Sequence, residues 1–288
     1  MPIKQMIRAG VRKILFVRPK ESVSDAITRH KLHIKRKIDC RRLELPEFNL
    51  MLSDMGIQIG DVLIVHAAWR GCYALQATPN EVIASLKQCV GEEGTLLMPC
   101  YGADPIHFDV CHTPSAAGVL SELLRNDPKA MRSGFPNAAM CGVGPEAEEI
   151  LSTHIKSKYA FDEQSPYYKA IINHRAKVLL IGLPLRTAKI SAFHCGAYDA
   201  WFHSDTRDRH YRQGVRIASV IDAHGEAHQI MPYDRIAPGP CKKNYRKLFR
   251  SVPKTTQKRA GVRLIAFRGS DAYEAAKAFC QNGGTLYH

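Results

Sequence analysis

His194 is the residue whose position in the sequence best suits acid–base chemistry. It follows an apolar run, Val178 to Ile181, and a turn marked by Gly182 and Pro184. Such a short apolar run predicts a strand covered on both faces, and ligands of open α/β sheets bind at the carboxyl ends of these strands. An imidazole titrates near neutral pH, so it can accept a proton from an attacking nucleophile. A loop histidine is more often a polar surface residue, so a catalytic role needs support from the rest of the chain.

A second strand end carries small residues that favour ligand binding. The run Val62 to Val65 predicts another buried strand. Small residues directly after a strand let backbone N–H groups approach a phosphate or a carbonyl oxygen closely. We therefore expect the segment after this strand to contact a ligand, through His66, Ala67, Ala68, Trp69 and Arg70. A hydrogen bond from His66 to a loop, and a core position for Trp69, are the alternatives.

Strands and helices alternate along the chain from residue 43 onward. Thr78 and Glu81 form a capping-box pattern that predicts a helix ending at Gly91. Gly94 to Pro99 predicts the next strand, which completes a β-α-β unit. Further helices are expected over residues 118–125, 146–154, 167–173 and 270–281, and a hairpin around His224 and Gly225. This alternation predicts a three-layer α/β/α domain over residues 43–288, with a mixed, largely parallel sheet.

The positive charge of the chain is concentrated at its N-terminus. Residues 1–42 contain thirteen Lys and Arg residues and three acids, a net charge of +10 out of +14 for the whole chain. Apolar residues at helical spacing over residues 2–17 predict a basic amphipathic helix. This N-terminal extension either contacts an anionic membrane surface through residues 1–20 or packs on protein. The chain shows no recognised nucleic-acid-binding module, so we expect no nucleic-acid partner.

Cysteine usage and hydropathy predict a cytoplasmic protein, either free or peripheral to the inner face of the membrane. The nine cysteines are odd in number and lack paired C-x-x-C spacing, which is typical of a reducing compartment. No apolar run reaches the length of a membrane span, and no secretory signal is present. Four residues resemble metal ligands, but they alternate with Arg207 and Arg209, which favours a charged loop and predicts no metal: His203, Asp205, Asp208 and His210.

A train of motifs over roughly residues 45 to 205 resembles the antibiotic acetyltransferase family, whose named members are the aminoglycoside 3-N-acetyltransferases. The family's V-H-S-S-L-R is similar to Val65 to Arg70, and its G-x-x-G-T-L-x-M-P to Gly91 to Pro99. Its F-D-x-x-x-T-P-S segment is similar to Phe108 to Ser115. Its R-S-x-H-P and S-P motifs resemble Arg132 to Pro136 and the pair Ser165-Pro166.

This resemblance implies an acetyl-CoA-dependent N-acetyltransferase without a metal. The family's T-x-x-H-x-x-E keeps its histidine here as His194, but Ala197 stands in place of the glutamate. Asp199 is the nearest acid that could orient the histidine, with Asp162, Glu163 and a solvated Asp199 as alternatives. The resemblance also places acetyl-CoA near Arg132, Ser133 and Ser165, although Arg132 could instead pair with Glu122.

The departures from the family pattern bear on the acceptor. Cationic aminoglycosides need acids around them, and this basic chain lacks the family's glutamate and the aspartate after the Gly182 turn. We therefore expect an amino-sugar acceptor for a cell-surface polysaccharide or glycoconjugate, free or linked to a nucleotide or lipid. True aminoglycoside acetylation and a catalytically inactive CoA-binding scaffold are the alternatives.

Overall fold

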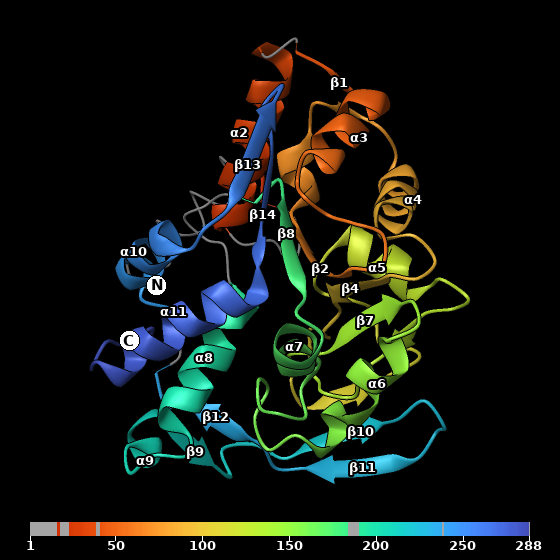
Figure 1. Cartoon of the computed structure of the whole chain (residues 1–288). Helices are drawn as coiled ribbons and strands as arrows, with labels where there is room; N and C mark the ends of the chain where they lie inside the picture. The colour runs from red at the N-terminus through yellow and green to blue at the C-terminus, as the bar shows by residue number, and fades with distance from the viewer. Residues whose placement is uncertain (1–15, 18–22, 39–40, 184–189, 238, 288) are drawn as a thin grey trace, which may run out of the picture.

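A seven-stranded mixed sheet forms the centre of the computed structural model (Figure 1), which describes residues 16–17, 23–38, 41–183, 190–237 and 239–287. Across the sheet the strands follow in the order β13 (Thr255–Arg259), β14 (Val262–Arg268), β8 (Lys177–Ile181), β2 (Val62–Ala67), β4 (Thr95–Pro99), β7 (Met140–Val143) and β6 (Met131–Arg132). The predicted mixed α/β architecture is confirmed.

Within this seven-stranded sheet, parallel pairing is confined to the three central strands. β2 pairs in parallel with both β4 and β8, whereas β14, β13, β7 and β6 join by antiparallel pairing. The carboxyl ends of β8, β2 and β4 therefore meet at one edge of the sheet. The sequence alone did not reveal β13 and β14, because the basic residues of this segment obscured the strand pattern of Val262–Arg268.

Helices cover both faces of the sheet, as the three-layer prediction requires. Side chains alternate between the faces along each strand, so Ile64 of β2 joins one core cluster while its neighbours Leu63 and Val65 join the other. The cluster that contains Leu63 and Val65 lies under α3 (Leu45–Ser53), α4 (Pro79–Val90) and α5 (Val119–Arg125). The cluster that contains Ile64 lies under α6 (Ala147–Leu151), α7 (Pro166–Tyr168), the π-helix η3 (Lys169–Asn173), α8 (Ser191–Trp201) and α11 (Gly269–Gln281).

Short elements complete the fold around this sheet. The predicted hairpin at His224 and Gly225 joins β10 (Ala218–Ile221) to β11 (Ala227–Ile230), and β10 also pairs with β5 (His107–Asp109). Two small sheets pair β9 (Tyr211–Gln213) with β12 (Tyr233–Arg235) and β1 (Leu43–Glu44) with β3 (Leu75–Gln76). The remaining short helices are η1 (Trp69–Cys72), η2 (Ser152–Lys156) and α9 (Arg207–His210).

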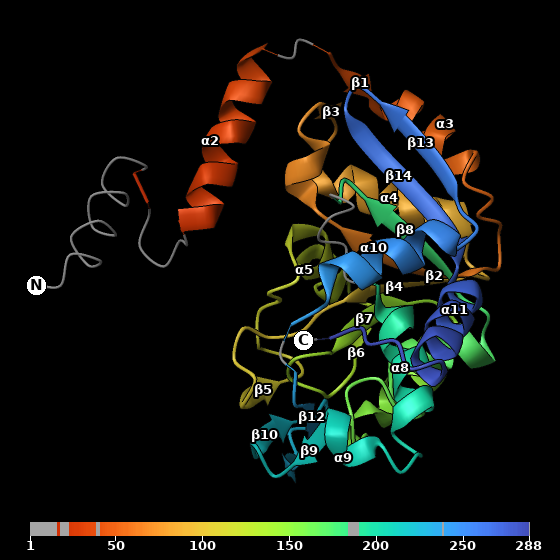
Figure 2. The ribbon, with the colours of Figure 1, turned by 90° about the vertical axis from the view of Figure 1, so that its left-hand side faces the viewer.

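Two basic helices were absent from the sequence prediction. α2 (Val23–Ile38) occupies what the sequence presents as a charged link, and Figure 2 shows it beside the rest of the ribbon. α10 (Lys242–Ser251) buries Tyr245, Leu248 and Phe249 beneath a row of Lys and Arg residues. The amphipathic helix expected over residues 2–17 falls mostly outside the described residues. In the described part of the chain, no helix is both long enough and apolar enough to cross a membrane.

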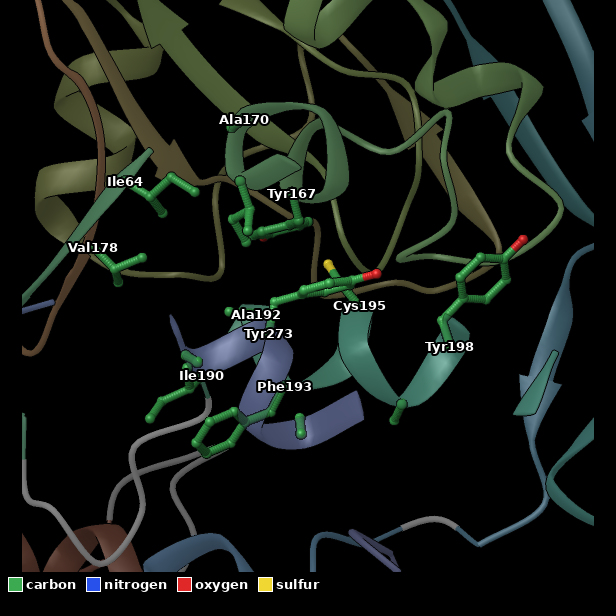
Figure 3. Packing of buried hydrophobic residues seen from close by; sticks show 14 of the residues in the cluster. Ile64, Tyr167, Ala170, Val178, Ile190, Ala192, Phe193, Cys195, Tyr198 and Tyr273 are labelled. Carbon is green, nitrogen blue, oxygen red and sulfur yellow. The ribbon is translucent and has the colours of Figure 1, made fainter. Parts of the chain in front are cut away.

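Helix α8 is held against α11 by an unusually close contact at Gly196 (Figure 1). A Cβ atom on Gly196 would lie 2.3 Å from the Tyr273 backbone carbonyl oxygen and 2.9 Å from the Lys277 backbone nitrogen. Figure 3 shows the packing around α8, with Ile64 and Val178 together on adjacent strands. Because the two helix backbones nearly touch, the position of every residue on α8 depends on α11.

The substitution Gly196→Ala tests this contact. Alanine is the better helix former by about 1 kcal/mol, but its methyl group would collide with rigid backbone atoms of α11, and overpacking of this kind costs about 1–3 kcal/mol. We expect the steric cost to win, so urea unfolding should show a lower free energy of unfolding. Glu274→Ala, on the exposed face of α11, is the control and should change little. An increase in stability for Gly196→Ala would contradict the close approach.

Candidate active site

A cavity of about 590 Å³ opens at the carboxyl ends of β2, β4 and β8. Gly71 and Gly182 let the turns after β2 and β8 approach each other, because a Cβ on Gly71 would lie 1.9 Å from the Gly182 carbonyl oxygen. Helix α8 brings two residues to the cavity, and β12 brings three. The cavity is lined by His66, Ala67, Pro99, Tyr101, Gly102, Ala117, Ser121, Asn137, Ala138, Tyr159, Ala160, Phe161, Tyr167, Leu183, Ser191, His194, Tyr233, Asp234 and Arg235.

His194 lies in the first turns of α8 and is 6% exposed, so only a small part of its ring can reach solvent or a ligand. Its ring stacks on Phe161, with the ring centroids 4.6 Å apart, and is nearly parallel to the ring of Tyr287. The prediction that the fold delivers this histidine to the ends of the parallel strands therefore agrees with the geometry.

The imidazole of His194 is surrounded by polar groups from the C-terminal part of the chain. Its Nδ1 lies 2.6 Å from the hydroxyl of Tyr287 and 3.5 Å from Nη1 of Arg235, while its Nε2 lies 3.2 Å from the hydroxyl of Tyr245. Burial raises the pKa of Tyr287 to about 12 and raises that of Tyr245 as well, so both hydroxyl groups are neutral at physiological pH. The two tyrosines therefore position the ring through neutral hydroxyl groups, while Arg235 places a positive charge beside it.

Sequence reasoning missed these three partners. Arg235, Tyr245 and Tyr287 lie 41, 51 and 93 residues from His194. No spacing or local motif connects them to the histidine, and two of them stand in a basic region whose charge dominates its sequence pattern. Only the folding of α10 and of the chain end onto α8 brings them to the ring.

Asp199 was predicted to orient His194, and the structure contradicts that pairing. Its carboxylate accepts hydrogen bonds from the hydroxyls of Tyr168, at 3.1 Å, and Tyr273, and lies 3.4 Å from Nζ of Lys277. Residues five apart occupy different faces of a helix, so Asp199 faces α7 and α11 while His194 faces the cavity. The carboxylate thus joins three helices together.

The alternative acids have other partners too. Asp162 is buried and accepts hydrogen bonds from the hydroxyl of Ser157 and from the backbone N–H groups of Lys158, Tyr159 and Gln164. Burial raises the pKa of Asp162. Glu163 accepts hydrogen bonds from the hydroxyl of Tyr198 at 2.8 Å and contacts Nε2 of His203 at 2.9 Å. The hydrogen bonds described for Asp162 and Glu163 thus go to partners other than His194.

The segment from His66 to Arg70, which begins within β2, reaches the cavity only in part. His66 and Ala67 line the cavity, whereas Ala68, Trp69 and Arg70 are absent from the described lining. The hydroxyl of Ser191 lies 3.3 Å from Nε2 of His66, and burial lowers the pKa of His66 to about 4, so this imidazole is neutral. Trp69 packs against the core cluster beneath α4, the alternative weighed for it from the sequence.

Three residues predicted to bind acetyl-CoA instead hold loops in the structure. The guanidinium of Arg132 donates hydrogen bonds to the carbonyl oxygens of Cys100, Val110 and Thr113, while Glu122 pairs with Arg125. In the described contacts, Glu122 therefore pairs with Arg125 and not with Arg132. Ser133 is buried against His154, and Ser165 caps α7 by accepting a hydrogen bond from the Tyr168 N–H. None of the three lines the cavity.

The charged segment around His203, predicted to be a loop, includes the short helix α9, and its side chains make contacts within the protein. His203 contacts Glu163, and the guanidinium of Arg207 pairs with Asp208 at 3.0 Å. His210 stacks on Trp201 with ring centroids 3.9 Å apart. These pairings explain the charged residues of the loop through packing and salt bridges.

The charges of the cavity lining are nearly balanced. Asp234 is the sole carboxylate among the lining residues, and both of its oxygens accept hydrogen bonds from Nε of Arg216, at 3.1 and 2.9 Å. Arg235 carries a positive charge in the same wall. Aromatic residues supply much of the remaining lining, with Tyr101, Phe161 and Tyr233 among them. The cavity therefore suits a polar ligand with apolar faces, such as a sugar ring.

The family model of the aminoglycoside 3-N-acetyltransferases matches residues 64–279. Aminoglycoside N(3)-acetyltransferase IX of Micromonospora chalcea is 29% identical over 158 residues, which cover 47% of this chain and 56% of that protein. Aminoglycoside N(3)-acetyltransferase III of Pseudomonas aeruginosa is 26% identical over 226 residues, covering 68% and 82%. The chain spans about half the length of most of the curated relatives it matches.

Solved structures share the fold. The structure of AAC-IIIb with CoASH has a TM-score of 0.70 at 21% identity, covering 85% of this chain and 99% of that one. AAC-VIa bound to sisomicin has a TM-score of 0.71 at 18% identity, with 85% and 100% coverage. The arrangement of sheet and helices is therefore the one found in these proteins.

Acid sensitivity of the fold should depend on His154, which lies behind the cavity wall. It is fully buried, it contacts Ser133, and it stacks on Phe135 at 4.8 Å. Burial lowers its pKa to about 3 from the ordinary 6.5. Below about pH 6.5 the unfolded chain binds a proton at this histidine, whereas the folded chain binds it only near pH 3. The free energy of unfolding therefore decreases as the pH is lowered through this window, by up to about 1.4 kcal/mol per pH unit.

The variant His154→Gln removes this proton uptake. Its free energy of unfolding in urea, measured between about pH 4.5 and 6.5, should depend less on pH than that of the unmodified chain, even if the variant is less stable overall. The slope, and not the absolute stability, is the readout. Equal slopes for the two chains would show that His154 does not titrate as its burial requires.

Proposed function

Because the chain belongs to the family of aminoglycoside 3-N-acetyltransferases, we propose that it transfers an acetyl group from acetyl-CoA to an amine of an amino sugar, with His194 as general base. The observation that carries the proposal is the buried imidazole of His194 in the wall of the cavity where the parallel strands end. Its two tyrosine contacts hold the ring in one orientation.

The proposed reaction places the proton on His194. The amine nitrogen attacks the thioester carbonyl carbon, the carbon–sulfur bond breaks, and an amide and the CoA thiol are the products. The amine must lose a proton as the new bond forms, and His194 accepts it and returns it to the departing thiolate. When Nδ1–H donates to the hydroxyl of Tyr287, Nε2 carries the lone pair that accepts this proton, and the hydroxyl of Tyr245 at 3.2 Å must turn its own proton away from Nε2 for the transfer.

Acetyl-CoA is proposed to bind at the carboxyl ends of β2 and β8. The cavity reaches this edge through Ala67 and Leu183, and the small side chain of Ala67 allows close approach to the backbone. Arg132, Ser133 and Ser165 are removed from the proposed contacts, because each is engaged with the protein itself.

The proposed acceptor is an amino sugar of the kind that the relatives' names indicate. Family membership favours an aminoglycoside over a polysaccharide precursor, because the relatives carry aminoglycoside acetyltransferase names. A role in surface polysaccharide biosynthesis stays a narrower prediction, as does a nucleotide- or lipid-linked acceptor. Membrane contact through residues 1–20 of a cytoplasmic chain also stays a prediction, which sedimentation with anionic vesicles before and after their deletion would test.

An inactive CoA-binding scaffold is the second candidate, favoured by the alanine at position 197 where the family has glutamate. It differs from the enzyme in one measurable respect. A scaffold would bind acetyl-CoA and release no CoA thiol with any amine, whereas the enzyme releases one thiol for each amide formed.

The variant His194→Ala tests the enzyme proposal. We expect acetyl-CoA binding to persist, while acetyl transfer slows by about two to four powers of ten, as is usual when a positioned base is lost. His203→Ala, an exposed histidine 60% accessible at its side chain, is the matched control and should keep the full rate. Thiol release measures the rate, and calorimetry measures the binding. An undiminished rate for His194→Ala would assign the proton to another group.

The variant Tyr287→Phe tests the orientation of the ring. It removes the hydroxyl at 2.6 Å and leaves the stacked ring in place, so we expect kcat to fall by about tenfold with little change in the acetyl-CoA affinity. Asp199→Asn should affect stability more than kcat, since its carboxylate holds α7, α8 and α11 together. A greater loss of kcat in Asp199→Asn than in Tyr287→Phe would reverse this assignment.

A further inference from the structure

We infer that the acceptor carries an anionic group, a phosphate or a carboxylate, near the amine that is acetylated, and that Arg235 binds this group. The inference rests on the proposed function, because it names the acceptor class for the same cavity. It departs from the polycationic acceptors of the named relatives, and three observations support it: the state of Asp234, the position of Arg235 and the proton transfer at His194.

The first observation is that the cavity has little negative charge to offer a polyamine. Among the described residues that line it, Asp234 is the sole carboxylate. Arg216 donates to both of its oxygens, and Arg216 is itself held by the carbonyl oxygen of Pro105 at 2.6 Å and by Oδ1 of Asn137 at 3.3 Å. An acceptor with several ammonium groups would find the charge of this carboxylate already compensated.

The second observation is the position of Arg235. Its guanidinium lies 4.3 Å from the centre of the Tyr287 ring and in the cavity wall, with Nη1 3.5 Å from Nδ1 of His194. A guanidinium has five N–H donors, and the contacts described for Arg235, to His194 and to Tyr287, engage only part of them. A planar fork of donors matches the oxygens of a phosphate or a carboxylate. Arg235 can therefore bind an anion directly beside the proposed base.

The third observation concerns the proton that His194 accepts. Protonation makes the imidazole a cation beside the guanidinium of Arg235, and two like charges this close disfavour the charged imidazole in a partly buried site. An anionic group bound to Arg235 offsets that repulsion. The acceptor would then contribute to its own acetylation, because its anion assists both binding and the transfer of the amine proton.

Four amine probes test the inference with the full chain and acetyl-CoA. Glucosamine 6-phosphate and 2-amino-2-deoxyglucuronic acid each combine an amine with an anion, and they distinguish a phosphate from a carboxylate. Glucosamine, which has the amine but no anionic group, is the control. Sisomicin represents acceptors with several amines. We expect the unmodified chain to show kcat/KM at least tenfold higher for one anionic probe than for glucosamine or sisomicin.

Two variants then separate recognition from structure. Arg235→Gln should abolish the preference for the anionic probe over glucosamine, whereas a merely structural role would lower kcat/KM for both equally. Arg216→Gln should release the charge of Asp234 and raise the ratio of sisomicin to anionic probe. Arg250→Gln, an exposed arginine on α10 outside the cavity lining, is the matched control and should preserve all ratios.

The outcomes distinguish this inference from the proposed function. Preferential acetylation of sisomicin, together with equal losses for all probes in Arg235→Gln, would overturn the anionic acceptor and leave the acetyltransferase standing. Acetyl-CoA binding without thiol release from any probe would overturn the acetyltransferase and the anionic acceptor together. A preference for an anionic probe that disappears in Arg235→Gln and persists in Arg235→Lys would support both.

Discussion

The close packing of α8 on α11 is the constraint on which the candidate site depends. Gly196 lets the two helix backbones nearly touch, and no side chain could take its place without moving one of them. This contact sets the depth of His194 in the cavity wall. It also sets the path of the chain after α11, which brings the hydroxyl of Tyr287 to the same imidazole. One glycine contact thus positions both the proposed base and its nearest partner.

The polar groups around α8 are divided between two tasks. On the face toward the cavity, His194 contacts neutral hydroxyl groups and a guanidinium, an arrangement that can hold or release a proton. On the face toward α7 and α11, Asp199 accepts hydrogen bonds from Tyr168 and Tyr273 and stabilises the packing of three helices. A buried carboxylate with several donors is satisfied by them, so it is not available to a histidine on another face of the same helix.

Some residues of the family motifs in this chain line the cavity, and others lie outside its lining. Arg132, Ser133 and Ser165 belong to motifs that resemble the family pattern, and each of them fixes a loop through hydrogen bonds to the protein. His66 and His194 belong to the same series of motifs and reach the cavity. A motif match therefore identified the region that forms the site, while the contacts of each residue decided whether it supports the wall or faces the ligand.

The sequence by itself determined the mixed α/β architecture, most of the elements between residues 43 and 181, and the placement of His194 at the end of a buried strand. These features follow from local patterns: apolar runs, capping residues and turn glycines act over a few residues. The partners of His194 depended on the tertiary structure, because Arg235, Tyr245 and Tyr287 meet the ring only when distant segments pack on α8. The charge of the cavity was likewise decided in three dimensions, since the pairing of Arg216 with Asp234 joins residues 18 positions apart that share no motif.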